Sequence, residues 1–317
     1  MDPWVIGVDL GATKVAVGLV APDSRIIARR RFPTGAPQGP SHVVEGIVRA
    51  VRELEAHLPR GAHVAGLGIC SPGPLDHVGG VIIDPPNLPG WSSVPMRQLL
   101  AERLEMPVCL EHDAKAAALG EYHFGAARGA RDMVYVVVGT GVGAAIIIDG
   151  RLYRGRHNSA GEVGHITIAL QGARCSCGSC GCVETFLSGP HLGRAYAEAA
   201  AREGLAAPAV DVTGETVARL AEKGDPLALE VMGRAGEALG TAVASLAMIL
   251  DIDLYVIGGS VAKAGELLLA PARQAICRHS FRSVSEHVRI VQCGLGDDGP
   301  ILGCALLARL ALCGVDA

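Results

Sequence analysis

The sequence predicts an α/β protein made of two related halves that face one cleft. A strand, a tight glycine-containing turn and a second strand follow one another at residues 4–20 and again at 134–148. Half of the residues are apolar but only 3% are aromatic, a composition that suits buried parallel strands and closely packed helices. With 317 residues, the chain is long enough for two domains.

The first half is predicted from apolar runs of strand length and from apolar positions at helical spacing. Asp113 is the carboxylate at which a strand ends and a helix begins, in an N-cap or first-turn position. The expected elements are strands at residues 4–9, 15–20 and 108–113 and helices at 43–57, 96–104 and 114–124.

The second half repeats the opening hairpin and adds a third strand after the turn of Asp149 and Gly150. Its expected elements are strands at residues 134–138, 144–148, 151–153 and 254–257 and a long helix at 226–250. A final amphipathic helix at 300–312 is predicted to pack back on the first domain. The predicted domains are therefore residues 1–115, completed by the C-terminal helix of about 300–317, and residues 116–299.

A run of cysteine and histidine residues in the second half has the spacing of a metal site. Thiolate and imidazole are the ligands that Zn²⁺ prefers, and Gly178 and Gly181 let the chain turn tightly between them. Four protein ligands leave no position for water, so the predicted Zn²⁺ is structural. Cys180 opens the alternative of an all-cysteine site, and a loop of free thiols is the non-metal alternative. The predicted ligands are His165, Cys175, Cys177 and Cys182.

The same run resembles the signature of the ROK sugar kinases, which include bacterial glucokinases, fructokinases and N-acetylmannosamine kinases. The sequence reads GEVGH at residues 161–165 and CSCGSCGCVE at 175–184. The resemblance extends from DLGATK at residues 9–14 to GPILGCALLA at 299–308. It implies two actin-like (ribonuclease H-like) α/β domains flanking a cleft, together with a structural zinc loop.

The turn of each half offers backbone N–H groups that can face a phosphate, although neither matches a Walker pattern. Either turn alone is as often structural, but as a pair they resemble the two phosphate motifs of the actin-like ATPases. The resemblance implies ATP as donor and Mg²⁺ supported by Asp9 through water. Ala12 replaces the commoner glycine without abolishing phosphate binding. The implied nucleotide-binding residues are Asp9, Gly11, Ala12, Thr13, Lys14, Gly139, Thr140, Gly141, Val142, Gly143, Gly258 and Gly259.

Phosphoryl transfer to a hydroxyl needs a positioned group that accepts the hydroxyl proton. Asp113 suits this role at its strand end, with a plain helix cap as the alternative, and the resemblance assigns the base to this aspartate. One ring nitrogen of His165 could bind metal while the other faces substrate. The sugar-binding residues implied by the resemblance are Ser71, Gly73, Asn87, His112, Asp113, Glu162, His165 and Glu184.

Two residues depart from the family pattern around the base. The family reads Glu-Asn-Asp-Ala-Asn, whereas residues 111–115 read Glu-His-Asp-Ala-Lys. His112 replaces an asparagine that hydrogen-bonds a sugar hydroxyl, and an imidazole can also donate or accept. Lys115 adds positive charge near the base, which favours an ionised Asp113. We expect the chemistry to persist while the identity of the sugar is open, and His112 packing away from the sugar is the alternative.

The predicted function is ATP-dependent phosphorylation of a hexose at its 6-hydroxyl, with glucose first and N-acetylmannosamine or fructose as alternatives. Polyphosphate is the alternative donor. A sugar-sensing protein without catalysis is the alternative of a different class. Sensors of this family that repress transcription carry a helix-turn-helix before the first phosphate motif, whereas eight residues precede Asp9.

The expected partners are a small sugar and a nucleotide. A net charge of −4 gives no basic face for nucleic acid and no polybasic segment for a membrane. The longest apolar runs have only strand length, and no signal peptide is expected before the first strand. Six scattered cysteines in apolar settings behave as buried free thiols. A cytoplasmic protein is expected, and the resemblance implies a homodimer.

Overall fold

The computed structural model describes residues 2–205 and 212–315. The chain forms two compact units: unit 1 contains Met1–Gly129 and Leu295–Ala317, and unit 2 contains Ala130–Gly294. The described helices include none that is both long and apolar enough to cross a membrane.

Unit 1 is built on a five-stranded sheet with strand order β3-β2-β1-β4-β7. The first three strands are antiparallel neighbours, and β1, β4 and β7 run parallel. The parallel strands therefore end at one edge of the sheet. The strand bounds are β1 Trp4–Leu10, β2 Lys14–Val20, β3 Ile26–Pro33, β4 Val64–Ser71 and β7 Val108–His112, with a small β5 Leu75–Asp76 and β6 Val81–Ile82 ladder.

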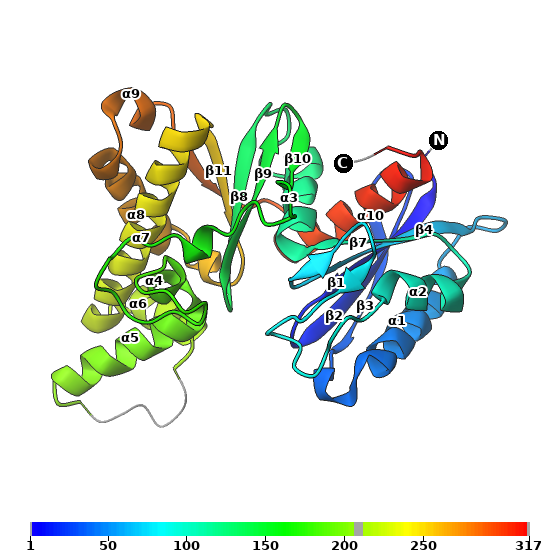
Figure 1. Cartoon of the computed structure of the whole chain (residues 1–317), viewed down its shortest axis with the longest axis horizontal. Helices are drawn as coiled ribbons and strands as arrows, with labels where there is room; N and C mark the ends of the chain where they lie inside the picture. The colour runs from blue at the N-terminus through cyan, green and yellow to red at the C-terminus, as the bar shows by residue number, and fades with distance from the viewer. Residues whose placement is uncertain (1, 206–211, 316–317) are drawn as a thin grey trace. The chain divides into compact units, whose positions relative to one another are not determined.

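Helices cover both faces of this sheet (Figure 1). Ile6 and Val8 pack into one core with α1 and α2, whereas Val5 packs against α10 on the opposite face. Gly7 and Gly68 lie beneath α10, where an added Cβ would come within 2.1 Å of the Ile301 oxygen or 1.9 Å of the Cys304 oxygen. Alternation along β1 places Asp9 on the same face as Gly7. The bounds are η1 Ala36–Gln38, α1 Pro40–Glu55, α2 Met96–Leu104, α3 Asp113–Phe124, η4 Gly296–Asp298 and α10 Gly299–Leu312.

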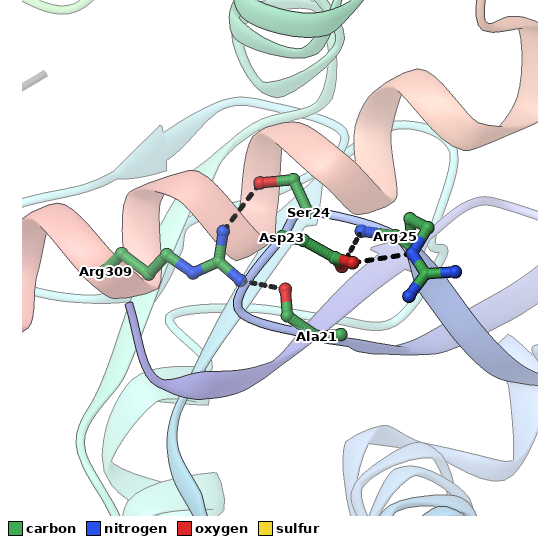
Figure 2. A network of polar contacts seen from close by, with 5 residues as sticks. All are labelled: Ala21, Asp23, Ser24, Arg25 and Arg309. Atoms are coloured by element: carbon green, nitrogen blue, oxygen red, sulfur yellow. Dashed lines mark hydrogen bonds and ion pairs between the residues drawn. The ribbon is translucent and has the colours of Figure 1, made fainter. Parts of the chain in front are cut away.

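Arg309 fastens α10 to the turn between β2 and β3. Its guanidinium donates to the Ala21 oxygen at 2.5 Å and to the Ser24 Oγ at 2.9 Å, as Figure 2 shows. A third bond, from Arg309 Nε, reaches the Pro3 oxygen at 3.3 Å. Arg25 closes the turn by donating to Asp23. Helix α10 is thus hydrogen-bonded to the turn between β2 and β3 and to the residue before β1.

Unit 2 repeats the sheet of unit 1, with strand order β10-β9-β8-β11-β12. As in unit 1, the first two pairs in this order are antiparallel and the last two are parallel. The two related halves predicted from the sequence are therefore present as two sheets of one topology. The strand bounds are β8 Met133–Val138, β9 Val142–Ile148, β10 Arg151–Tyr153, β11 Leu254–Gly258 and β12 Arg289–Gln292.

The helices of unit 2 share one hydrophobic core with its sheet, and α7 packs most extensively against α8. Apolar side chains of α7 such as Met232, Leu239 and Val243 are fully buried there. The bounds are η2 Val163–His165, α4 Glu184–Leu187, α5 Gly189–Arg202, α6 Gly214–Glu222, α7 Pro226–Leu250, η3 Val261–Ala264, α8 Glu266–His279 and α9 Arg282–Ser285.

The division between the units differs from the predicted domain boundaries. The sequence places boundaries at 115/116 and 299/300, whereas residues 116–129 and 295–299 belong to unit 1. The physical reason is that α3 packs along α10, so the helix begun by Asp113 stays with the first sheet. Gly120 and Gly303 permit this approach, because an added Cβ would lie 2.2 Å from the Gly299 oxygen or 1.8 Å from the Ala116 oxygen.

Candidate active site

The parallel strands of unit 1 bring several predicted site residues to one edge of the sheet. In the strand register Asp9 pairs with Cys70, Cys70 with Glu111, and Ser71 with His112. Asp113 begins α3 directly after β7. Residues separated by more than 100 positions in the sequence therefore meet because three parallel strands end in register.

Asp9 is a partly buried carboxylate near the end of β1. Its Oδ1 accepts a hydrogen bond from the Cys70 thiol at 3.6 Å. Burial raises the pKa of Asp9 to about 6, and the negative charge of Asp113 acts in the same direction. A divalent cation at this carboxylate would favour its ionised form, and Mg²⁺ commonly uses one or two protein carboxylates beside substrate phosphates.

Two polar groups approach the same oxygen of Asp113. The backbone N–H of Ala114 donates a hydrogen bond to Oδ1 at 2.6 Å, and the His112 Nδ1 lies 2.9 Å from that oxygen. Within residues 2–205 and 212–315, Oδ2 receives no hydrogen bond. The Asp113 side chain is 40% exposed, so solvent or a ligand can reach it. The cap-like bond to Ala114 and a role as base are therefore compatible.

The other sugar-binding residues predicted in unit 1 differ in accessibility. Ser71 is fully buried and its hydroxyl donates to the Pro72 oxygen at 3.1 Å. Gly73 packs against the His112 ring, where an added Cβ would lie 2.8 Å from Cδ2 and 2.9 Å from Nε2. Asn87 is exposed on the loop before Trp91. The geometry thus favours Asn87 over Ser71 as a side chain available to a hydroxyl group.

The first glycine turn, residues 11–13, is shaped by the backbone around it. The Gly11 N–H bonds the Lys14 oxygen at 3.0 Å, the Thr34 N–H bonds the Thr13 oxygen at 3.0 Å, and the Thr34 hydroxyl donates to the Gly11 oxygen at 2.7 Å. Neither Gly11 nor Ala12 has a positive φ, which explains why alanine is accommodated. Lys14 is exposed and its ammonium pairs with Asp297 at 3.1 Å.

The second glycine turn, residues 139–141, is held by hydrogen bonds to Glu184 and from the start of α5. The Gly139 N–H bonds the Gly141 oxygen at 2.9 Å, and the Gly189 N–H at the start of α5 bonds the Gly139 oxygen at 2.8 Å. Directly after the turn, the Val142 N–H donates to Glu184 Oε2 at 3.0 Å. An added Cβ at Gly141 would lie 2.9 Å from that oxygen. Glu184, predicted as a sugar-binding residue, therefore also braces the second glycine turn.

A cavity of about 630 Å³ opens beside this turn within unit 2. It lies where α5 and α6 begin and where the chain leaves β11. Thr140 is exposed at its edge. The lining residues are Gly139, Thr140, Gly189, Pro190, Gly193, Arg194, Ala197, Val212, Thr213, Gly214, Glu215, Ser260 and Val261.

The structure brings the four predicted metal ligands together. The donor atoms of His165, Cys175, Cys177 and Cys182 all lie within 4.8 Å of one another. The His165 Nδ1 is 3.6 Å from the Cys175 sulfur, and the sulfurs of Cys177 and Cys182 are 3.7 Å apart. Tetrahedral zinc with Zn–S of about 2.3 Å and Zn–N of about 2.0 Å requires about 3.8 Å between sulfurs and about 3.5 Å between sulfur and nitrogen. The donor set and its spacing therefore fit Zn²⁺.

The two glycines in the cluster loop stand at positions where the backbone conformation favours glycine. Gly178 and Gly181 have φ of 94° and 63°, values that favour glycine. At Gly181 an added Cβ would also lie 1.7 Å from the Ala169 oxygen. Cys180 is not part of the described cluster. Nδ1 of His165 faces the sulfurs, and Glu162 is exposed at the start of η2.

Sequence reasoning missed most of the cavity wall. Gly258 and Gly259 were predicted to bind nucleotide, whereas the next two residues, Ser260 and Val261, line the cavity. Gly258 and Gly259 pack on β8, where an added Cβ would meet the Tyr135 hydroxyl at 2.0 Å or the Val138 oxygen at 2.3 Å. The Thr213 cap of α6, which precedes Glu215, is the sequence signal that could have pointed to the helix starts.

Comparison with known proteins places this site in a family. The ROK family model matches residues 5–311. A glucokinase of Halalkalibacterium halodurans is 32% identical over 97% of this chain and 96% of its own, and an N-acetylmannosamine kinase of Escherichia coli O157:H7 is 34% identical over 96% and 98%.

A solved structure shares the fold over nearly the whole length. The ROK family glucokinase from Streptomyces griseus, in complex with glucose and AMPPNP, is 33% identical and covers 96% of this chain and 99% of its own, with a TM-score of 0.83. The mixed α/β fold with two sheets thus matches that of ROK kinases. On its sequence and its fold, the chain belongs to the ROK family.

Proposed function

We propose that this protein is an ATP-dependent sugar kinase that phosphorylates a hexose at its 6-hydroxyl, with glucose as the leading substrate. The observation that carries the proposal is Asp113, at the strand edge that also presents Asp9. One oxygen of its carboxylate accepts no hydrogen bond from the described residues. Support comes from the similar glucokinase structure, which holds glucose and AMPPNP.

The nucleotide is proposed to bind in unit 2. Its phosphates would face the backbone of the second glycine turn, and its adenosine would occupy the cavity between the starts of α5 and α6. Thr140 lies exposed at the turn and can donate its hydroxyl to a phosphate oxygen. Ser260 and Val261 line this cavity, and Gly258 and Gly259 directly before them remain proposed nucleotide contacts.

Asp9 is the proposed partner of Mg²⁺, through water, beside the first glycine turn. When bound, Mg²⁺ supplies positive charge that offsets the developing negative charge on the transferred phosphoryl group. Thr13 and Lys14 are the proposed phosphate contacts of this turn. Lys14 would exchange its exposed ion pair with Asp297 for a phosphate oxygen, a small cost because such pairs contribute little.

Asp113 is the proposed general base. Its carboxylate accepts the proton of the sugar 6-hydroxyl while the hydroxyl oxygen forms a bond to the γ-phosphorus of ATP. The bond between the γ-phosphorus and the β–γ bridging oxygen breaks, and ADP leaves with that oxygen. Asn87, Glu162 and the Nε2 of His165 are proposed to hydrogen-bond the remaining sugar hydroxyls.

A structural Zn²⁺ is proposed for the cluster of His165, Cys175, Cys177 and Cys182. The support is the agreement of the 3.6 Å and 3.7 Å donor separations with tetrahedral zinc. The ion would hold the loop that ends in Glu184 and so keep that carboxylate beneath the second glycine turn. A homodimer is also proposed, and light scattering of the purified protein measures it.

N-acetylmannosamine is the second candidate substrate, favoured by the 34% identity to an N-acetylmannosamine kinase. The test is release of ADP from ATP over a panel of glucose, mannose, fructose and N-acetylmannosamine, with Asp113→Asn as the matched control. We expect the highest kcat/KM with glucose. Asp113→Asn should lower kcat by about 10²–10⁴-fold while sugar affinity changes little. Absence of turnover with every sugar, or near-normal turnover of the variant, would refute the proposal.

A further inference from the structure

We infer that His112 is a positioning residue that fixes Asp113 by its Oδ1 and leaves Oδ2 as the one oxygen that takes the sugar proton. The inference rests on the proposed function, because it assigns a role beside the proposed base. It concerns a residue at which this chain departs from the family pattern Glu-Asn-Asp-Ala-Asn.

The polar contacts of Asp113 are unequally divided between its oxygens. The Ala114 N–H donates to Oδ1 at 2.6 Å, the His112 Nδ1 lies 2.9 Å from the same oxygen, and no partner among the described residues bonds Oδ2. A protonated Nδ1 at this distance is attracted to the carboxylate, whereas an unprotonated Nδ1 would set its lone pair against it. Rotation of the carboxylate would lose both contacts at Oδ1, so the pair of contacts favours one orientation of the Asp113 carboxylate.

His112 is itself held at its backbone and at its ring. The His112 backbone N–H donates to Glu111 Oε1 at 2.9 Å. The ring edge opposite Asp113 rests on Gly73, where even a methyl group would come within 2.8 Å of Cδ2. Because β4 and β7 pair Ser71 with His112, the loop that carries Gly73 leaves the sheet directly beside the ring. The imidazole thus spans the gap between that loop and Asp113.

This arrangement changes the role expected for His112 from the sequence. With Nδ1 committed to Asp113, only Nε2 could meet a sugar hydroxyl, and its edge lies against Gly73. During transfer the sugar proton moves to Oδ2, Asp113 becomes neutral, and His112 keeps its Nδ1 proton. Misplacement of a reacting group by about 1 Å can cost about 10²-fold in rate. By holding Oδ2 in place, His112 would therefore raise the rate of phosphoryl transfer.

The test compares His112→Ala with His63→Ala, an exposed histidine that precedes β4. We expect His112→Ala to lower kcat by about tenfold to a hundredfold with KM for ATP within about twofold, and His63→Ala to match the wild type. His112→Asn, which retains a donor amide, should recover part of kcat. Gly73→Ala should reproduce part of the loss by displacing the ring.

The division between kcat and KM separates positioning from a general structural defect. A misplaced Asp113 should lower kcat while KM for ATP stays close to that of the wild type, because the nucleotide is proposed to bind in unit 2. The partial recovery in His112→Asn should appear in kcat. Thermal unfolding checks that each variant is folded.

The outcomes distinguish this inference from the proposed function. If the wild type shows no kinase activity, or Asp113→Asn stays active, the proposed function fails. If Asp113→Asn is inactive but His112→Ala keeps the kcat of the wild type, only the role of His112 is overturned.

Discussion

The two glycine turns occupy equivalent places in the two sheets, each directly after the first strand of its unit, yet they are held in different ways. The first turn is shaped by neighbouring backbone and by Thr34, a buried residue that follows β3. The second is braced by Glu184, a side chain 42 residues further along the chain, and by the start of α5. The two sheets thus share one topology, but the first turn is held by the strands next to it and the second by residues far along the chain.

The carboxylates beside the turns also differ. Asp9 is partly buried near another carboxylate, and its pKa is raised to about 6. Glu184 accepts the Val142 N–H and lies two residues after Cys182, a member of the Cys/His cluster. The short helix η2, which carries His165 of the same cluster, packs on the start of β9, where an added Cβ at Gly164 would lie 2.1 Å from the Val142 oxygen. We therefore expect the second turn to depend on the Cys/His cluster with its proposed Zn²⁺, and the first turn on the proposed Mg²⁺.

The largest effect is expected from Cys182→Ser, which removes a buried ligand of the proposed Zn²⁺. We expect loss of bound zinc, destabilisation on the order of 4 kcal/mol, and weaker nucleotide binding in the absence of sugar. Elemental analysis, urea unfolding and calorimetric titration with ADP measure the three effects. Cys180→Ser is the matched control in the same loop, and zinc content equal in both variants would contradict the ligand assignment.

Asp9→Asn should affect stability and catalysis in opposite directions. The folded carboxylate binds protons more tightly than the unfolded one, so wild-type stability falls as pH rises from about 4 to about 6. The amide avoids this cost, so the variant should be more stable at pH 7 by at most about 3 kcal/mol, with the difference vanishing near pH 4.

The measurement is urea unfolding at several pH values without Mg²⁺, beside kinase activity. Activity should fall, because the amide of the Asp9→Asn variant lacks the charge that supports Mg²⁺. Asp23→Asn is the control, since Asp23 lies in an exposed turn and its pKa is lowered by the hydrogen bond from Arg25. A stability difference between wild type and Asp9→Asn that does not change with pH would contradict the raised pKa.

Glu184→Ala should weaken ADP binding without sugar by about tenfold, because the Val142 N–H loses a charged acceptor worth about 1.5–3 kcal/mol. Glu184→Gln keeps an acceptor oxygen and should retain most of the affinity. Glu162→Ala is the control for a carboxylate of the same unit that is exposed and not bonded to the turn. Equal ADP affinity in the alanine variants would show that Glu184 does not brace the second turn.

The smallest effect is expected at the first turn. Thr34→Val keeps the shape of a fully buried side chain but removes its hydrogen bond to the Gly11 oxygen. We expect a loss of about 1 kcal/mol in unfolding free energy and no change in zinc content or in ADP binding. An effect on ADP binding as large as that of Glu184→Ala would mean that the two turns are not supported independently.

Local signals in the sequence were sufficient for several of the regular elements and for the Cys/His cluster, whereas strands such as β4 and β12 and helices such as α5, α6 and α8 were not predicted. Helices α2 and α7 begin and end at the predicted residues, Met96–Leu104 and Pro226–Leu250, because apolar periodicity and flanking turn residues fix such segments. Likewise, the spacing of His165, Cys175, Cys177 and Cys182 predicted the cluster, because its ligands lie within one short run. The strand β3, whose exposed arginines hide its alternation, was not predicted.

Tertiary structure decided which distant groups meet. The cavity wall joins the starts of α5 and α6 to the second glycine turn, and no local pattern relates these segments. Similarly, only the register of β4 and β7 sets Gly73 against the His112 ring, and only the fold of the cysteine loop sets Glu184 beneath Val142. Sequence periodicity reports the environment of neighbouring residues, whereas these contacts depend on how whole elements pack.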